Sequence, residues 1–401
     1  MTNVDWPLSD YDRFQLFTED ECRKACLDDC FCAVAIVREG DCWKKKFPLS
    51  NGRFDSSNGR IALIKLSASQ HSSPPSNCHV HLPLESEKPM IDESRLVMLG
   101  TNLKRFTYDE LEEATDGFKD ELGTGAFATV YKGTLAHDNG NLVAVKKLDR
   151  EVGEGDKQEF EKIVGAISRT IHKNLVQLLG FCNKGQHRLL VYEFMSNGSL
   201  ATFLFGNSRP SWYKRMEIIL GTARGLLYLH EECSIQDIHG DINPQNILLD
   251  DSLTARISDF GLAKLLKMDQ TGTTTGVMGT KGYAAPEWFK KVPITFKVDV
   301  YSFGIVLLEL IFCRKNFEPE VEDEKQMVLG EWAYDCYKEG KLDLLVGNDQ
   351  EALDDMKRLE KFVMVAFWCT QEDPSQRPTM KTVMEMLEGA TEVPVLQTHP
   401  H

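Results

Sequence analysis

Three side chains that carry oxygen lie close together in the stretch from Ile238 to Gly261. Asp241 and Asn246 are five residues apart, and Asp259 follows after the length of a short hairpin. Carboxylate and amide oxygens on converging loops can hold Mg²⁺, and a further carboxylate can accept the proton of a hydroxyl. The stretch therefore predicts a magnesium site beside a general base.

A glycine-rich turn and a lysine precede these residues. Leu122–Val130 has the pattern of strand, glycine turn and strand, in which missing Cβ atoms let backbone N–H groups approach nucleotide phosphates. The turn alone is weak support, because such turns are often plain hairpins and Ala128 replaces the usual third glycine. Val143–Lys147 is predicted to be the next strand. Its Lys146 has the spacing at which an ammonium can hold the α and β phosphates.

Four further motifs follow in order: Gly279–Tyr283, Ala285–Glu287, Asp299–Gly304 and Arg377–Met380. With the earlier motifs they resemble protein kinases, and specifically plant S-domain (G-type lectin) receptor-like serine/threonine kinases. The resemblance implies an α+β, bilobal protein-kinase fold with a β-rich N-lobe and a helical C-lobe. It also implies ATP and Mg²⁺ as cofactors, with Mn²⁺ as an alternative ion, and proteins as substrates.

The same resemblance implies roles for single residues. Asp241 and Lys146 would be catalytic, and Asn246 and Asp259 would hold the metal. In kinases of this type a threonine at the position of Thr280 contacts the catalytic aspartate, and the acceptor is a small hydroxyl. The nucleotide-binding residues implied are Leu122, Gly123, Gly125, Val130, Ala144, Lys146, Glu193, Met195 and Leu248, with Glu193 and Met195 in the adenine hinge. Tyr192 takes the gatekeeper position, Glu287 and Arg377 form a structural ion pair, and Asp299 anchors the catalytic loop.

The predicted helix that includes Gln158–Thr170 departs from the kinase pattern. Aligned backwards from His172, it places Ile163 where kinases keep the glutamate that pairs with Lys146. Glu161 lies about 200° round the helix from that position and should face elsewhere, while Glu159 is one turn earlier. Glu159 would reach Lys146 only if the helix slid by about a turn.

The catalytic loop departs from the pattern at two positions. Asn243 replaces a lysine whose cation normally lies near the transferred phosphate, and asparagine is neutral and shorter. Loss of such a preorganised contact costs on the order of 10²–10³ in rate. Gly240 replaces an arginine that can bind a phosphorylated activation loop, so we expect weaker control by phosphorylation there.

The first 78 residues contain six of the 11 cysteines. Cys22 and Cys26 have the spacing of one helix face, and Ile61–Leu66 is predicted to be a closing strand. The region resembles the PAN/apple module of plant S-domain receptor kinases, a small disulfide-type domain. The disulfide candidates are Cys22, Cys26, Cys30, Cys32 and Cys42, whereas Cys182, Cys233, Cys313, Cys336 and Cys369 are predicted to be reduced thiols. A scaffold without a ligand of its own is favoured over a ligand-binding module.

The composition of the 401-residue chain argues against some classes of binding partner. A formal net charge of -15 would repel nucleic-acid phosphates and anionic membrane surfaces, and no metal is expected beyond the ion bound with the nucleotide. The first residues lack the apolar stretch of a secretory signal, and no segment has the ~20 apolar residues of a membrane span. The family implies a plasma-membrane protein with a cytosolic kinase domain, whereas the chain as given is expected to be cytoplasmic.

These patterns predict a module over residues 10–67, a linker over 68–103, a helical segment over 104–117 with a Thr107/Glu110 capping box, and a kinase domain over 118–392. The leading hypothesis is an ATP-dependent serine/threonine kinase of receptor-like type, with a co-receptor or self-association as further partners. One alternative is a nucleotide-binding pseudokinase, suggested by Ile163 and Asn243. Another, of a different class, is a ligand-binding module in residues 10–67.

Overall fold

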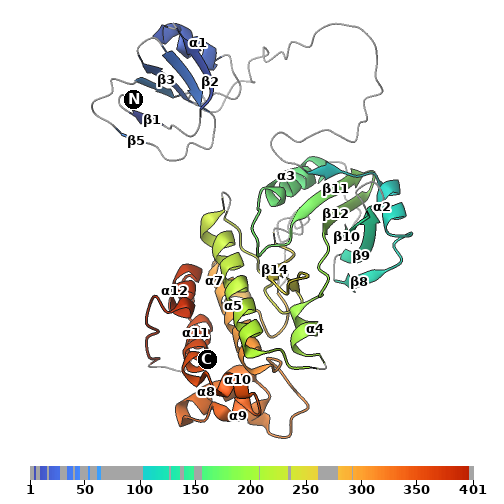
Figure 1. Ribbon diagram of the computed structural model, residues 1–401, viewed down its shortest axis with the longest axis vertical. Helices are drawn as coiled ribbons and strands as arrows, with labels where there is room; N and C mark the ends of the chain where they lie inside the picture. Colours follow the sequence, from blue (N-terminus) through green and yellow to red (C-terminus); the bar gives the residue numbers. More distant parts are fainter. Residues whose placement is uncertain are drawn as a thin grey trace. The chain divides into compact units, whose positions relative to one another are not determined.

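A computed structural model shows two compact units, one over Met1–Ile91 and one over Asp92–His401 (Figure 1). The structure describes residues 4–5, 10–15, 18–27, 34–38, 41–45, 53–54, 61–64, 103–125, 128–135, 140–148, 156–206, 208–233, 236–260, 279–290 and 292–396. No helix within these ranges combines the length and the apolar character that crossing a bilayer requires.

The N-terminal unit contains one helix and a four-stranded antiparallel sheet among its described residues. The strand order is β2-β4-β3-β6, and β1 pairs with β5 separately. The bounds are β1 Val4–Asp5, β2 Asp10–Gln15, α1 Glu19–Leu27, β3 Val34–Arg38, β4 Asp41–Lys45, β5 Arg53–Phe54 and β6 Ile61–Ile64. The predicted closing strand is thus confirmed in β6, which pairs with β3 at the edge of the sheet.

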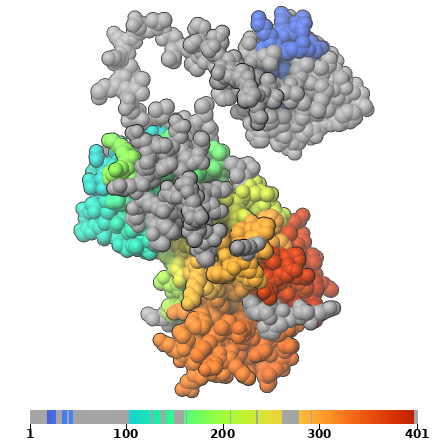
Figure 2. Space-filling model, turned by 180° about the vertical axis from the view of Figure 1, so that it is seen from behind, coloured from blue at the N-terminus to red at the C-terminus, as the bar shows by residue number. Residues whose placement is uncertain are grey.

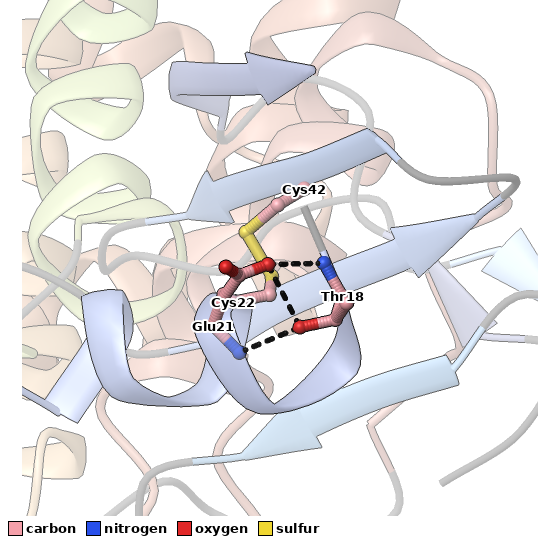
Figure 3. Close-up of a disulfide and its surroundings, with 4 residues drawn as sticks. All are labelled: Thr18, Glu21, Cys22 and Cys42. Carbon is pink, nitrogen blue, oxygen red and sulfur yellow. Dashed lines mark hydrogen bonds between the residues drawn. A yellow bond between two sulfur atoms is a disulfide. The ribbon is translucent and has the colours of Figure 1, made fainter. Parts of the chain in front are cut away.

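Helix α1 is fixed to the sheet by a disulfide and begins with a reciprocal cap (Figure 3). The Thr18 hydroxyl accepts a hydrogen bond from the Glu21 backbone N–H at 3.3 Å, and the Glu21 carboxylate accepts one from the Thr18 N–H at 2.8 Å. The Thr18 N–H and the Thr18 hydroxyl both donate to the Glu21 carboxylate, and these two hydrogen bonds lower the pKa of Glu21. Cys22 is disulfide-bonded to Cys42 of β4, and Cys26, also disulfide-bonded, is buried on the same helix face. Cys30 and Cys32 lie outside the described residues.

The second unit opens with a six-stranded sheet in the order β7-β11-β12-β10-β9-β8. Its bounds are β7 Lys104–Arg105, β8 Glu121–Thr124, β9 Ala128–Leu135, β10 Asn141–Leu148, β11 Leu178–Lys184 and β12 His187–Glu193. Side chains alternate across a strand, so β12 contributes to two apolar clusters. Leu189 and Val191 pack toward helix α2 (Tyr108–Ala114), and Leu190 and Tyr192 pack toward helix α3 (Asp156–Ser168).

The segment before the kinase motifs is part of this sheet. Strand β7 pairs in parallel with β11, and a Cβ on Gly180 would lie 2.3 Å from the Lys104 carbonyl oxygen, so only glycine lets β7 approach this closely. The predicted helix after it is confirmed as α2, with Thr107 and Glu110 forming the predicted capping box.

The C-lobe is mainly helical and fills the lower part of the view in Figure 2, in yellow to red. Helix α7 is buried from Val298 to Phe312, because α5 and α11 pack against it. The bounds are α4 Leu200–Leu204, α5 Trp212–Leu227, η3 Tyr228–Glu232, β13 Ile247–Leu249, β14 Ala255–Ile257, η4 Pro286–Phe289, α7 Lys297–Phe312, η5 Glu324–Gln326, α8 Leu329–Glu339, α9 Asp343–Val346, α10 Gln350–Leu353, α11 Met356–Cys369 and α12 Met380–Glu388. The five cysteines of this unit are thiols, as predicted.

Candidate functional site

Lys146 pairs with the aspartate that was predicted to hold metal. The lysine lies on β10 directly across from Val130 on β9, so both side chains share one face of the sheet. Its ammonium nitrogen is 2.7 Å from Asp259 Oδ1, and the lysine side chain is 10% exposed. Asp259 itself has a positive φ of 63°, a backbone conformation that costs energy for a residue with a Cβ. Asp259 is therefore the carboxylate that pairs with Lys146, in place of the glutamate that is missing at position 163.

Helix α3 presents an apolar residue where the paired glutamate would lie. Ile163 is buried in the main core cluster, together with Phe160 and Val164. The Glu161 carboxylate points instead to β7 and β11, where it accepts hydrogen bonds from Arg105 at 2.9 Å and from Asn183 at 2.8 Å. The predicted direction of Glu161 is thus confirmed. The side chain of Glu159 lies outside the described residues.

The glycine-rich turn joins β8 to β9, as predicted. The Gly125 N–H donates to the Ala128 carbonyl at 2.8 Å, which closes the turn, and Ala128 begins β9 as a buried residue. A Cβ on Gly123 would meet nothing within 4 Å, and one on Gly125 only an ordinary contact at 3.6 Å. Packing within the described chain therefore does not require these glycines. Leu122 in β8 is exposed.

The predicted adenine-binding residues gather where the lobes join. Ala144 on β10 and Leu248 on β13 are half-buried and pack against the cluster that contains Tyr192 and Met195. The Glu193 carboxylate, at the end of β12, accepts from the Gln177 N–H at 2.8 Å and pairs with an arginine of β14. Its side chain thus has a structural role, which leaves only backbone groups at this residue to bind a base.

The Tyr192 side chain is buried behind this region. Its hydroxyl has no hydrogen-bond partner among the described residues. Burial, with the charge of Asp259 nearby, raises the pKa of Tyr192 above its usual value, so the phenol remains neutral.

The loop around Asp241 is anchored by Asp299, as predicted. Asp299 is completely buried in α7, and its carboxylate accepts hydrogen bonds from the backbone N–H groups of His239 at 2.9 Å and Gly240 at 2.7 Å, and from His230 Nε2 at 2.9 Å. Burial alone would raise the pKa of Asp299, but these hydrogen bonds and the neighbouring histidines outweigh burial and lower it. Gly240 has a φ of +77°, which favours glycine at this turn.

The Asp241 carboxylate lies in a cluster of polar side chains. Its Oδ1 accepts from the Thr280 N–H at 2.8 Å, from the Thr280 hydroxyl at 2.7 Å and from the Asn243 amide at 3.1 Å. The Asn243 amide nitrogen is also 3.0 Å from the Thr280 hydroxyl oxygen. Asn243 is only 2% exposed, so it holds the loop and the carboxylate in place rather than presenting a polar group outward.

Asn246 directs its amide nitrogen to Asp241, donating to the backbone carbonyl at 2.8 Å and to Oδ2 at 3.0 Å. With the nitrogen so placed, the amide oxygen is the atom available to a cation. Asp259 follows Asn246 through the β13–β14 hairpin, and the Ser258 N–H and hydroxyl both bind the Asn246 carbonyl. One amide and one carboxylate oxygen, completed by phosphate and water, suit Mg²⁺. Among the described residues no group of three or more His, Cys, Asp or Glu side chains could hold a metal alone.

The other implied contact, between Glu287 and Arg377, is a buried bidentate pair. Arg377 donates to the two carboxylate oxygens at 2.6 and 2.8 Å. It joins η4 to the segment before α12 and does not touch the polar cluster. One further contact was not predicted from the sequence. The Tyr283 hydroxyl, three residues after Thr280, donates to Glu309 of α7 at 2.8 Å. The only signal for Glu309 was an acidic residue within an otherwise apolar helix.

Comparison with known proteins agrees with this arrangement. The family of protein tyrosine and serine/threonine kinases matches residues 117–387. The G-type lectin S-receptor-like serine/threonine-protein kinase LECRK3 of Oryza sativa subsp. indica is 52% identical over 98% of this chain and 53% of its own length. The relative named LECRK4 from the same subspecies is 50% identical, with the same coverage. The kinase named RLK1 of Arabidopsis thaliana is 44% identical over 98% of this chain and 52% of its own length.

The chain therefore spans about half the length of the curated relatives it matches. All three are named as receptor-like serine/threonine-protein kinases. These names give no support to the pseudokinase alternative.

Proposed function

Because the chain belongs to the protein tyrosine and serine/threonine kinase family, we propose that residues 118–392 transfer the γ-phosphate of ATP to serine and threonine hydroxyls of proteins. The observation that carries this proposal is the Asp241 cluster. Its carboxylate is held by the backbone and hydroxyl of Thr280 and by two amides, Asn243 and Asn246. A carboxylate fixed in this way on a buried anchor is suited to orient an acceptor hydroxyl.

Asp241 would act as the base through Oδ2. Three hydrogen bonds occupy Oδ1, whereas Oδ2 accepts one, from Asn246, and has capacity for a further donor. An acceptor hydroxyl at Oδ2 would be oriented toward the phosphate. It could pass its proton to the carboxylate as its oxygen bonds to the γ-phosphorus and the bond from that phosphorus to the β–γ bridging oxygen breaks, releasing ADP. The contact with Thr280 supports an acceptor of serine/threonine type.

The nucleotide would lie between the lobes, with Ala144 and Leu248 on either side of the base and the backbone of Glu193 and Met195 at its edge. The open space at Gly123 supports phosphates close to the backbone of the turn. Mg²⁺ held by Asn246 and Asp259 would supply charge neutralisation at the transferred phosphate.

Lys146 and Asp259 must then exchange partners. In the present state they neutralise each other at 2.7 Å. When nucleotide and metal bind, the phosphates would pair with Lys146 and the cation would pair with Asp259. Binding therefore replaces one ion pair with two. Because Ile163 offers no carboxylate, Lys146 has the phosphates as its alternative partner. Asn243 supplies no cation, which we expect to lower the rate by on the order of 10²–10³.

We further infer that the N-terminal unit is a PAN/apple-like module, supported by the Cys22–Cys42 disulfide between α1 and β4. The receptor-like names of the relatives support membrane association. We propose a co-receptor or a second copy of this chain as a further partner. In this proposal the module is a disulfide-stapled scaffold that precedes the kinase domain in the chain.

The experiment is transfer of labelled γ-phosphate from ATP with Mg²⁺ by the whole chain. Asp241→Asn should lower transfer by about 10²–10⁴-fold, because it removes the base. The matched control is Asp251→Asn, in the exposed turn between β13 and β14, which should stay within twofold of the parent. Equal transfer by the parent and Asp241→Asn would contradict the proposal.

A further inference from the structure

A surface depression of about 520 Å³ lies beside the catalytic loop. It is formed by four segments: helix α4 with the residue after it, the catalytic loop, the segment after Thr280, and the loop after α7. Its lining residues are Ala201, Thr202, Phe205, Gln245, Lys281, Gly282, Tyr283, Lys315, Asn316 and Phe317. The proposed mechanism uses none of these side chains.

The depression begins one residue from the contact that holds the catalytic carboxylate. Lys281 follows Thr280, whose N–H and hydroxyl both bind Asp241. Gln245 of the catalytic loop, four residues after Asp241, also lines the depression, and its N–H donates to Asn243 Oδ1 at 2.9 Å. An extended peptide rises about 3.3 Å per residue, so a substrate with its hydroxyl at Asp241 reaches the depression within a few residues.

The charged side chains among the described residues that line the depression have one sign. They are Lys281 and Lys315, and both are exposed. Within the described residues neither ammonium forms an ion pair, and the Lys315 ammonium lies 5.9 Å from the centre of the Phe205 ring. The chain as a whole carries a net charge of -15, so two lysines on one hollow, with no acidic partner among the described residues, are a local exception.

Hydrogen bonds to the buried Glu309 and to one another fix three of the lining residues, Tyr283, Asn316 and Gly282. The Glu309 carboxylate accepts from the Tyr283 hydroxyl at 2.8 Å and from the Asn316 N–H at 2.7 Å, and the Asn316 amide donates to the Gly282 carbonyl at 2.6 Å. Glu309 is completely buried and does not line the hollow. Burial raises the pKa of Glu309 to about 7, so its negative charge is also weakened near neutral pH. The exposed charge of the site therefore belongs to the lysines.

We propose that this depression selects substrates by binding an anionic side chain, a carboxylate or a phosphate, within a few residues of the acceptor hydroxyl. The inference rests on the proposed kinase function and adds a substrate class to it: acidic or already phosphorylated peptide segments. Lys281 and Lys315 supply the cations, and Gln245 and Thr202 supply neutral polar groups at the rim.

The test is binding of fluorescent peptides to the whole chain, followed by anisotropy. Each peptide contains one serine and a single glutamate, phosphoserine, glutamine or lysine at one of four positions on either side of it. At the preferred position the anionic peptides should bind roughly 3- to 10-fold tighter than the glutamine peptide, and salt should reduce the difference. Comparing glutamate with phosphoserine identifies which anion the site prefers.

Charge reversal decides whether the named lysines are responsible. Lys281→Glu/Lys315→Glu should remove the anion preference and favour the lysine peptide. The control Lys357→Glu/Lys381→Glu reverses the same number of charges at exposed positions in α11 and α12 and should keep the parent preference. Equal binding of glutamate, phosphoserine and glutamine peptides by the parent would overturn the inference, and so would an anion preference that survives Lys281→Glu/Lys315→Glu.

Peptide binding can be measured without phosphate transfer, so the substrate preference and the kinase function are tested independently. Anion-selective binding without phosphate transfer would overturn only the kinase function. Transfer without anion selectivity would overturn only the substrate preference.

Discussion

The catalytic loop and the lysine site lie in the same cleft region but are held in different ways. Asp299 and the Asp241 cluster fix the loop through a buried carboxylate and several hydrogen bonds among protein groups. Lys146 has one ion pair, to Asp259, and helix α3 offers it only the apolar Ile163. The loop is thus preorganised without a ligand, whereas the lysine site must exchange partners when nucleotide and metal bind.

The catalytic loop and the lysine site therefore differ in how much they must rearrange before phosphate transfer. Groups that act on the acceptor hydroxyl need no rearrangement, because their hydrogen bonds are already made. Groups that hold the phosphates must first break a contact at 2.7 Å. We therefore expect the departures at Ile163 and Asn243 to affect nucleotide binding and rate, and not the integrity of the loop.

Removing the loop anchor should have the largest effect on stability. Asp299→Ala leaves His230 and two buried backbone N–H groups without their acceptor, and should lower the free energy of unfolding by about 3–5 kcal/mol. Urea unfolding of the parent, Asp299→Ala and Asp299→Asn measures it, with the isosteric Asn variant expected between the two. A loss below 1 kcal/mol in Asp299→Ala would contradict the anchoring role.

Helix α7, which carries the loop anchor Asp299, also carries Glu309, a buried carboxyl group with a raised pKa. Burial raises the pKa of Glu309 from 4.5 to about 7, so between these pH values the folded chain binds more protons at this site than the unfolded chain. Stability therefore falls as the pH rises through this window, by roughly 3 kcal/mol in total.

Glu309→Gln cannot ionise and should lose this dependence. Unfolding free energies of the variant and the parent at pH 5 to 8 check it, with the exposed Glu331→Gln on α8 as the control. If the difference between Glu309→Gln and the parent stays constant over this range, the raised pKa is wrong.

The smallest effect is expected at the outer side of α3. Arg105 and Glu161 are partly exposed, so breaking their ion pair with Arg105→Ala should cost about 0.5–1 kcal/mol. Urea unfolding can compare this variant with Lys119→Ala, which breaks a more exposed pair with Asp116. An effect no larger than that of Lys119→Ala would show that β7 does not help to hold α3.

The sequence predicted those features that depend on local spacing. The glycine turn, the β13–β14 hairpin and the Thr107/Glu110 cap are set by residues within a few positions of one another. The direction of Glu161 followed from 100° per residue in a helix. The role of Asp299 as anchor followed from the resemblance to kinases, and the hydrogen bonds to His239 and Gly240 bear it out.

Other features depend on contacts between distant segments and left no local signal. The Lys146–Asp259 pair joins residues that are far apart in the chain and depends on where α3 packs. Strand β7 has only two residues, too few to show a periodicity. The glycine at position 180 is consistent with the close approach of β7, but a single glycine does not predict a strand. Glu309 is bound by Tyr283, which comes from a distant segment of the chain, and by the Asn316 N–H in the loop after α7.

The most direct test of the central claim is single-turnover phosphate transfer by the whole chain and by Ile163→Glu/Asn243→Lys, which restores both missing groups. We expect transfer by the parent, at a rate that the double variant raises by up to about 10²–10³-fold. Addition of Asp241→Asn should lower transfer in both by about 10²–10⁴-fold. If the parent transfers no phosphate while the restored variant does, the fixed catalytic loop is not sufficient and the chain is not an active kinase.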